Sequence, residues 1–376
     1  MEPNATESIQ RLCQTRGKST IAWLMFLAGL TGNVIALVIL QTRRRKDRRH
    51  EQKSLFRVLV TTLVITDLVG TCAVSPLVLA SYAANKTMLA MGHGPNDTAV
   101  CKYFGFSMTF FSLATMSILF AMALERYFSI GYPYLYERHF GRRCGYISVS
   151  FIYVLCVLFC VLPFLDIGHY VQYCPGTWCF IQMNTKEFKD IVYANLYATV
   201  MLLLISSTAV CNLCVIYNLV RMYRRRKATE GSVVRRKGSH RSHSITEEVE
   251  HLLFLVFMTV AFVICSLPLM VRVYMDSLGR KGEDHRIDLI ALRFLSINPI
   301  INPWVFIILG PSRLQFLRGA LCRARKASSH PQKVLFTSPS LASPDTSVSL
   351  HTKHWADGQS QDSWKCIIYR VYPKEQ

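Results

Sequence analysis

Residues 289–309 read LIALRFLSINPIINPWVFIIL and limit the possible folds more than any other stretch of the chain. The stretch is long and apolar enough to cross a bilayer as a helix. It also carries Arg293 near one end and two Asn-Pro pairs, at 298–299 and 302–303, in its middle. A charge inside a membrane span needs a partner, and each proline removes a backbone donor that neighbouring groups must replace. We therefore predict a helix within a membrane bundle, with a charged site near one membrane face and a polar, kinked segment nearer the other.

Composition also favours a membrane protein. The chain of 376 residues is 51% hydrophobic and only 18% charged, whereas a soluble protein of this size carries more charge. Its net charge of +20 does not indicate nucleic-acid binding, because the basic residues gather in alternate connections between apolar runs, as they do on the cytoplasmic side of membrane proteins. We predict an all-α, seven-transmembrane helix bundle with an extracellular amino terminus (1–18) and a cytoplasmic carboxyl terminus. The predicted bundle covers 19–309, with spans at 19–40, 55–82, 102–127, 146–165, 191–219, 247–275 and 289–309.

The predicted outer segments have the features of an extracellular environment. Three Asn-X-Thr sequons, at Asn4, Asn85 and Asn96, fall on this side and predict glycosylation. We expect no removable signal peptide, because no separate apolar core with a cleavage site precedes the first span.

Four of the thirteen cysteines lie in these outer segments, where an oxidising compartment permits disulfides. The run 173–180, YCPGTWCF, combines two cysteines with a Pro-Gly turn and indicates a tightly constrained loop. We predict that Cys179 pairs with Cys101, which would tie the loop over the start of span three, and that Cys174 pairs with Cys13. The alternative is four free thiols.

Several polar or helix-bending residues lie inside the spans. Gly32-Asn33 in span one suits close helix contact. Asp67 in span two is either a functional carboxylate or a neutral, hydrogen-bonded residue that ties helices together. Arg272, one turn beyond Pro268 in span six, is expected to snorkel outward.

Beyond residue 309 the chain changes character. Residues 310–326 alternate basic and apolar side chains, which predicts a short amphipathic eighth helix on the inner membrane surface. Cys322 in this segment is a palmitoylation site or an unmodified cysteine. Residues 327–376 are rich in Ser, Thr and Pro, and we predict a disordered cytoplasmic tail with phosphorylation sites.

Taken together and in order, these features resemble the rhodopsin-like G-protein-coupled receptors over residues 19–325. The motifs that carry the resemblance are Gly32-Asn33, Asp67, Glu125-Arg126-Tyr127, the Cys101 and Cys179 pair, Pro268 and Asn302-Pro303-Trp304-Val305-Phe306. Within that family, the outer-loop run YCPGTWCF and RFLS in span seven resemble the prostanoid receptors. The stretches MTFFSLATM, FAMALERY and VQYCPGTWCFI look most like the prostaglandin E receptors that couple to the stimulatory G protein.

For the outer half of the bundle, the resemblance implies a site for prostaglandin E, a lipid carboxylic acid. Arg293 would bind the carboxylate through charge-assisted hydrogen bonds. Ser296, one turn deeper, would face a ring or chain hydroxyl, and Trp178 would cap the pocket. Two further hydrogen-bond donors and two wall residues are implied: Tyr82, Thr177, Ser75 and Met25.

For the inner half, the resemblance implies a switch toward the stimulatory heterotrimeric G protein, which raises cyclic AMP. Arg126, within Glu125-Arg126-Tyr127, would be held by Glu125 at rest and released on activation, and Tyr134 would insert into a groove on the G protein. A relay would couple the two ends through Asp67, Asn302, Pro303 and Pro268. Arrestin and receptor kinases would act on the tail, membrane lipids would surround the bundle, and no cofactor or metal is implied.

Two departures from the resemblance concern span seven. Prostanoid receptors usually carry Asp where this chain has Asn302, and Pro299 adds a second proline one turn before Pro303. Both lie in the implied relay, so the strength of signalling and the bend of this span stay open.

Other functional classes are disfavoured by features that the sequence lacks. A transporter or channel would show inverted repeats or paired charges along a pore, and an intramembrane enzyme needs a nucleophile with its base or a metal-binding pair such as HExxH. We predict that the chain is not an enzyme. Two alternatives remain within the receptor class: a prostaglandin D receptor, and a lipid-binding receptor that does not signal.

Overall fold

The computed structural model describes residues 19–46, 55–92, 97–174, 176–183, 185, 187–230, 239–278 and 285–309. Seven helices in these ranges are long and apolar enough to cross a membrane. In chain order they are α2 (Thr20–Lys46), α3 (Leu55–Ala84), α4 (Ala99–Gly131), α6 (Arg142–Val161), α7 (Phe188–Glu230), α8 (Ser239–Ser277) and α9 (His285–Leu309). The prediction of a seven-span helical bundle is therefore confirmed.

Helix α4 lies at the centre of the bundle. It packs against α3, α6, α7, α8 and α9 and against both strands. In the most apolar stretch of α4, 61% of the residues are buried, compared with 22% in that of α6. The apolar residues of α6 therefore face outward, where lipid would cover them, while α4 connects the two ends of the bundle through its core.

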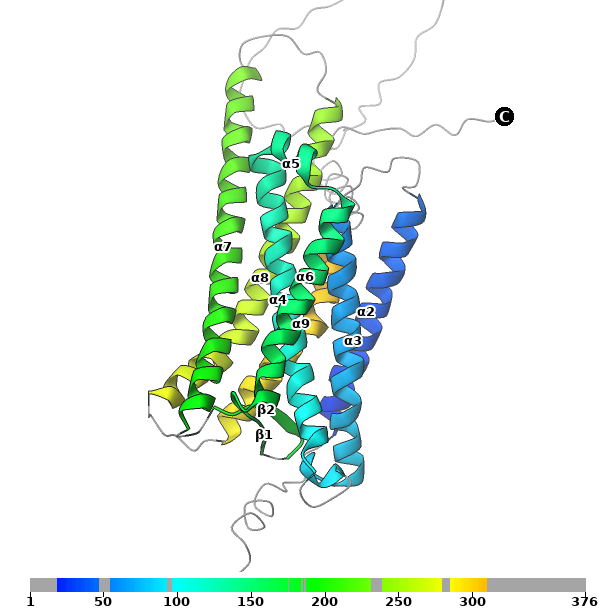
Figure 1. The fold of residues 1–376 in the computed structure, drawn as a ribbon. Coiled ribbons are helices and arrows are strands. Elements are labelled where there is room, and N and C mark those ends of the chain that lie inside the picture. Colours follow the sequence, from blue (N-terminus) through cyan, green and yellow to red (C-terminus); the bar gives the residue numbers. More distant parts are fainter. Residues whose placement is uncertain are drawn as a thin grey trace, which may run out of the picture. The chain divides into compact units, whose positions relative to one another are not determined.

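A short hairpin closes one end of the bundle, and the small helix α5 (Pro133–His139) lies at the other end (Figure 1). Strands β1 (Tyr170–Tyr173) and β2 (Trp178–Ile181) pair antiparallel, with Tyr173 opposite Trp178. Gly176 makes the turn possible, because it has a positive φ of 90° and its N–H donates to Tyr173 O over 2.8 Å. Two 3-10 turns, η2 (Leu89–Met91) and η3 (Leu162–Leu165), complete the connections at this end.

Two connections are more helical than the sequence suggested. The segment 221–243 reads as a basic loop, yet α7 continues to Glu230 and α8 begins at Ser239. The segment RMYRRRKATE consists mostly of good helix formers, so the helix continues beyond its apolar part. The run after span three, which also reads as a loop, forms α5, with Pro133 in its first turn, where a missing N–H has no cost.

Helices α2 and α9 approach closely at Gly32. A Cβ at this position would lie 2.9 Å from Trp304 Nε1 and 3.2 Å from Pro303 Cγ, so a larger residue would push the helices apart. Pro303 has no N–H to give to the carbonyl of Pro299 one turn earlier. The neighbouring Asn33 side chain donates to that carbonyl over 3.0 Å instead. Gly32 and Asn33, which the sequence predicted to permit close helix contact, therefore lie where α2 and α9 meet.

Several predictions fall outside the described residues. These are the amino-terminal segment 1–18 with Asn4 and Cys13, the sequon at Asn96, the amphipathic helix 310–326 with Cys322, and the tail 327–376. Asn85 is described and is exposed to solvent, as a glycosylated residue must be.

The Asn33 contact predicts a coupling between two helices. Replacing Asn33 by Leu is expected to destabilise the protein by roughly 1–3 kcal/mol, because the half-buried Pro299 carbonyl loses its donor. In a Pro303→Ala background, residue 303 has a backbone N–H that can donate to the Pro299 carbonyl. Asn33→Leu should therefore reduce the stability less in that background. Thermal unfolding of the purified protein in detergent measures both costs, and equal losses in the two backgrounds would contradict this role for Asn33.

Candidate functional site

A cavity lies inside the half of the bundle that the β1–β2 hairpin closes, which is called the outer half below; the half that carries α5 is called the inner half. The cavity holds about 800 Å³ of empty space, including the part open to the outside, and is lined by residues of α2, α3, α4, α8, α9 and the hairpin. Its wall is largely apolar, with a few hydroxyl, amide and carboxyl groups, which is the usual make-up of a small-molecule site. The polar lining residues are Asp67, Thr71, Ser75, Ser112, Thr115, Ser296 and Asn298.

Four of the seven predicted ligand contacts line this cavity: Met25, Ser75, Trp178 and Ser296. Trp178 is buried and packs edge-to-face on Phe104, with ring centroids 5.7 Å apart. Ser296 Oγ donates to the carbonyl of Leu292 over 3.0 Å and lies 3.9 Å from Met108 Sδ. The tryptophan is therefore fixed in orientation, and the serine keeps lone pairs for a ligand.

The other three predicted contacts do not line the cavity. Arg293 is half-buried on α9, and within the described part of the chain no acidic side chain lies in ion-pair distance of it. Thr177 is buried, and its Oγ1 has no hydrogen-bond partner among the described residues. Tyr82 is half-buried near the outer end of α3. Arg293 and Thr177 therefore each have a hydrogen-bond donor that the described residues leave free to bind an anion.

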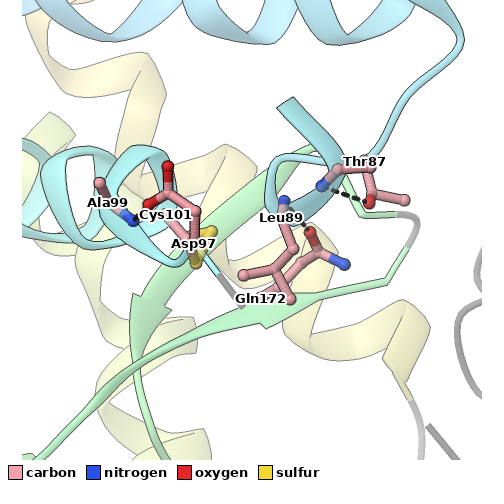
Figure 2. The surroundings of a disulfide bond; sticks show 8 residues. Thr87, Leu89, Asp97, Ala99, Cys101 and Gln172 are labelled. Carbon is pink, nitrogen blue, oxygen red and sulfur yellow. Dashed lines mark hydrogen bonds between the residues drawn. A yellow bond between two sulfur atoms is a disulfide. The ribbon is translucent and has the colours of Figure 1, made fainter. Parts of the chain in front are cut away.

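The hairpin forms a lid that is tied to its neighbours. The predicted Cys101–Cys179 disulfide is present and links the outer end of α4 to β2 (Figure 2). Gln172 Oε1 accepts from the Leu89 N–H over 2.9 Å, which joins β1 to η2 (Figure 2). Cys174 is disulfide-bonded as well, and its predicted partner, Cys13, lies outside the described residues.

Tyr173 holds the lid together from inside, a role that no local sequence signal indicates. Its hydroxyl donates to the carbonyl of Ile181 over 2.7 Å and accepts from the Met183 N–H over 3.1 Å. Burial raises the pKa of the Tyr173 phenol above its ordinary value, so the hydroxyl stays protonated and keeps its donor.

A polar cluster forms the floor of the cavity at mid-membrane depth. Asn302 Nδ2 donates to Asp67 Oδ2 over 2.7 Å, and Thr115 Oγ1 donates to Asp67 Oδ1 over 2.9 Å. Asp67 and Asn302, both predicted relay residues, are therefore in direct contact, and the carboxyl ties α3, α4 and α9 together. Thr115 was not foreseen, because a threonine inside an apolar helix has no distinctive sequence signal. The other relay residues, Pro268 and Pro303, lie inside α8 and α9.

The predicted ion pair at the inner end of α4 is closed. Arg126 donates from Nε to Glu125 Oε2 over 2.5 Å and from Nη2 to Glu125 Oε1 over 2.6 Å. Sequence reasoning missed Tyr136 of α5, whose hydroxyl donates to the same Glu125 Oε1. The Arg126 guanidinium also lies 4.5 Å from the centre of the Phe56 ring.

The two tyrosines predicted to act at this end differ in their surroundings. Tyr127 packs against a small apolar cluster of Val215, Leu219 and Leu252. Tyr134 is 81% exposed on α5 and is available to a partner.

Arg272 does not snorkel outward, so that expectation is wrong. Its side chain is only 10% exposed and pairs with Asp288 of α9 over 2.8 Å. Asp276, one turn after Arg272 on α8, lies 3.7 Å from the same guanidinium. The closer partner, Asp288, lies on α9, so the sequence of α8 alone does not reveal it. Among the described residues, no cluster of His, Cys, Asp and Glu could hold a metal ion.

A bundle with an outer cavity under a disulfide-linked lid, a mid-membrane polar cluster and an inner ion pair is the architecture of a seven-transmembrane receptor. Residues 32–306 match the family described as 7 transmembrane receptor (rhodopsin family). The chain is 48% identical over 341 residues to the prostaglandin E2 receptor EP2 subtype of Mus musculus, which covers 87% of this chain and 91% of that protein. The prostaglandin D2 receptor of Mus musculus is 42% identical over 329 residues, covering 81% of this chain and 91% of that protein.

The crystal structure of squid rhodopsin has a TM-score of 0.68 at 14% sequence identity, covering 86% of this chain and 89% of that chain, and supports the fold. The chain belongs to the rhodopsin family of seven-transmembrane receptors and, within it, to the prostanoid receptors. It is therefore a multi-pass membrane protein, and its relatives are receptors, not enzymes.

The lid contacts predict an effect of Tyr173 that depends on pH. Tyr173→Phe is expected to destabilise the protein by roughly 1–3 kcal/mol at neutral pH, because the Met183 N–H and Ile181 carbonyl lose their partner. The difference from the parent protein should shrink above about pH 10, the ordinary tyrosine pKa, because ionisation of Tyr173 favours the unfolded parent there.

Thermal unfolding at several pH values measures this difference. Tyr103→Phe is the matched control, since Tyr103 is 51% exposed, and it should change little. A Tyr173→Phe variant as stable as the parent at neutral pH would show that the hydroxyl does not hold the lid.

Proposed function

We propose that this protein is a receptor for prostaglandin E that couples to the stimulatory G protein and raises cyclic AMP. The observation that carries the proposal is the 48% identity to a prostaglandin E2 receptor, which spans 91% of that protein. The corresponding identity to a prostaglandin D2 receptor is lower, at 42%. Prostaglandin D as the natural ligand is the second candidate, and it is favoured by the same carboxylate-binding chemistry.

The outer site suits a long acidic lipid. Its largely apolar wall would cover the hydrocarbon chains, since burial of apolar surface is the main driving force for binding such a ligand. The ligand carboxylate would bind Arg293, which has no acidic partner among the described residues. An ion pair formed on binding would remove the cost of a half-buried, unpaired guanidinium.

Polar groups around the cavity would orient the ligand. Thr177 and Tyr82 would donate hydrogen bonds to the carboxylate, and the unpartnered Thr177 Oγ1 supports this role. Ser296 would bind a ring or chain hydroxyl. Trp178 would cap the site, while Ser75 and Met25 would form part of its wall.

The inner end would act as the switch. Arg126 is paired to Glu125, and Glu125 is bonded to Tyr136; this closed arrangement would be the receptor at rest. Release of Arg126 would open a site for the G protein, into which the exposed Tyr134 would project. Tyr127 would hold the end of α7 beside this site through its apolar contacts.

The relay between the two ends would run through the Asp67 and Asn302 contact, with bends at Pro268 and Pro303. The cavity reaches Asp67 directly, so a ligand could alter this cluster without an intervening helix. Asn302 in place of the usual Asp removes one carboxylate from the cluster, which would change basal activity or ion sensitivity.

Further features are proposed from the sequence. The amino terminus would be extracellular and the carboxyl terminus cytoplasmic, in the plasma membrane. Glycosylation at Asn4, Asn85 and Asn96 and palmitoylation at Cys322 would follow from that orientation. The tail would bind arrestin and receptor kinases, and lipids would surround the bundle.

Arg293→Ala is expected to weaken the binding of labelled prostaglandin E2 by about ten- to a hundredfold, because charge-assisted hydrogen bonds contribute roughly 1.5–3 kcal/mol. The matched test compares prostaglandin E2 with its methyl ester, which lacks the carboxylate. The parent receptor should prefer the acid, and the Arg293→Ala receptor should bind acid and ester about equally.

Arg293→Lys is the control for charge, and it should retain part of the preference for the acid. Unchanged affinity in Arg293→Ala at normal surface expression, or a retained preference for the acid, would rule out Arg293 as the carboxylate site.

A further inference from the structure

Polar contacts hold the outer half of α8 to α7 and to α9. Toward α7, the Asn195 amide donates to Ser277 Oγ over 2.8 Å. Toward α9, Arg272 Nε donates to Asp288 Oδ1 over 2.8 Å. The outer end of α8 is therefore fixed against α7 and α9 by directional contacts in addition to apolar packing.

The contact with α9 is a buried ion pair. The Arg272 and Asp288 side chains are 10% and 7% exposed. Asp276, one turn after Arg272 on α8, lies 3.7 Å from the same guanidinium. Asp288 occupies the first turn of α9, where the helix dipole favours a negative charge. Because breaking one side of a buried pair leaves an uncompensated charge, this contact resists relative motion of α8 and α9.

The ion pair lies on the helix that carries the proposed carboxylate site. Asp288 and Arg293 are five residues apart on α9, which is roughly 7.5 Å along the helix axis. Leu292, between them, is fully buried, so this segment of α9 is anchored in the core. Strand β1 of the lid also packs against α9. The lid and α8 therefore both contact α9.

The position of Pro268 connects the pair with the rest of α8. Pro268 lies one turn inward from Arg272 and removes a backbone hydrogen bond of the helix. A helix bends most easily at such a point. A displacement of the outer segment of α8 can therefore change the angle of its inner segment, which extends toward the Glu125–Arg126 end of the bundle.

We propose that the Arg272–Asp288 pair transmits occupancy of the Arg293 site from α9 to α8. Arg272 is then a positioning residue for signalling and not a ligand contact. The inference rests on the proposed function, since it requires an acidic ligand at Arg293. The inference goes beyond the proposed function by naming the contact that links the ligand site to α8.

Thermodynamic reciprocity gives a direct test. A G protein that favours the active arrangement raises ligand affinity by the same factor by which the ligand raises G-protein affinity. The experiment measures the affinity of labelled prostaglandin E2 for the full-length receptor in membranes, with and without added stimulatory G protein. The ratio of the two affinities is the coupling factor, and a residue with a merely structural role would not change this ratio.

In the parent receptor the coupling factor is expected to be at least about fivefold, the lower end for coupled sites. Arg272→Gln should reduce it to about one, while affinity without G protein stays within about twofold, because Arg272 does not touch the ligand. Asp288→Asn should give the same loss, and the double variant should lose no more. The swapped variant, Arg272→Asp with Asp288→Arg, should recover part of the coupling.

Asp190→Asn is the matched control. Asp190 is a buried acid at the outer end of α7, paired with His169 over 2.8 Å, and it does not join α8 to α9. This variant should keep the full coupling factor. If the Arg272→Gln receptor does not reach the membrane, Asp288→Asn tests the same ion pair by changing its α9 residue.

The outcomes are distinguishable. A parent receptor that does not bind prostaglandin E2 would overturn the proposed function and this inference with it. Binding by the parent, with an unchanged coupling factor in Arg272→Gln or Asp288→Asn, would overturn the inference alone. A double variant whose loss of coupling is the sum of the two single losses would also overturn the inference, because the two residues would then act independently.

Discussion

Polar groups buried within a membrane bundle need partners inside the protein, and this constraint determines how the helices are joined. Four buried or part-buried polar contacts, three between helices and one within α4, lie at different depths of the bundle. The contacts are Arg272 with Asp288 near the outer end, Asp67 with Asn302 and Thr115 in the middle, Asn33 with the Pro299 carbonyl beside them, and Arg126 with Glu125 at the inner end. Helix α9 takes part in three of these four contacts, which helps to explain why a stretch with two prolines can be a stable membrane helix.

Arg293 differs from these groups, because no acidic side chain among the described residues balances it. Thr177 Oγ1, in the lid, is also buried without a partner. A protein that satisfies its other charges so closely gains from a ligand that supplies the missing one. The proposed acidic lipid would do so, and its apolar chains would match the cavity wall. The same cavity reaches Asp67, so the proposed ligand and the mid-membrane cluster would share a boundary.

Much of this architecture could be predicted from sequence, because hydropathy and charge bias are local properties. The seven spans and the outer disulfide followed from them. The partners of buried polar groups could not be predicted in the same way. Arg272 was expected to reach outward because Asp288 lies on another helix, and a single helix does not show which neighbour it faces. Thr115 and Tyr136 were missed for the same reason. The inner helix ends extended further than expected, since good helix formers continue beyond the apolar part.

Cyclic AMP in cells that express this chain, dosed separately with prostaglandins E, D, F and I, is the most direct measurement of the central claim. The account predicts a rise at the lowest concentration with prostaglandin E. A rise first with prostaglandin D would keep the fold and the arginine site and change the ligand. Silence to all four, with the receptor confirmed at the cell surface, would contradict a signalling prostanoid receptor and point to a relay that Asn302 and Pro299 have altered.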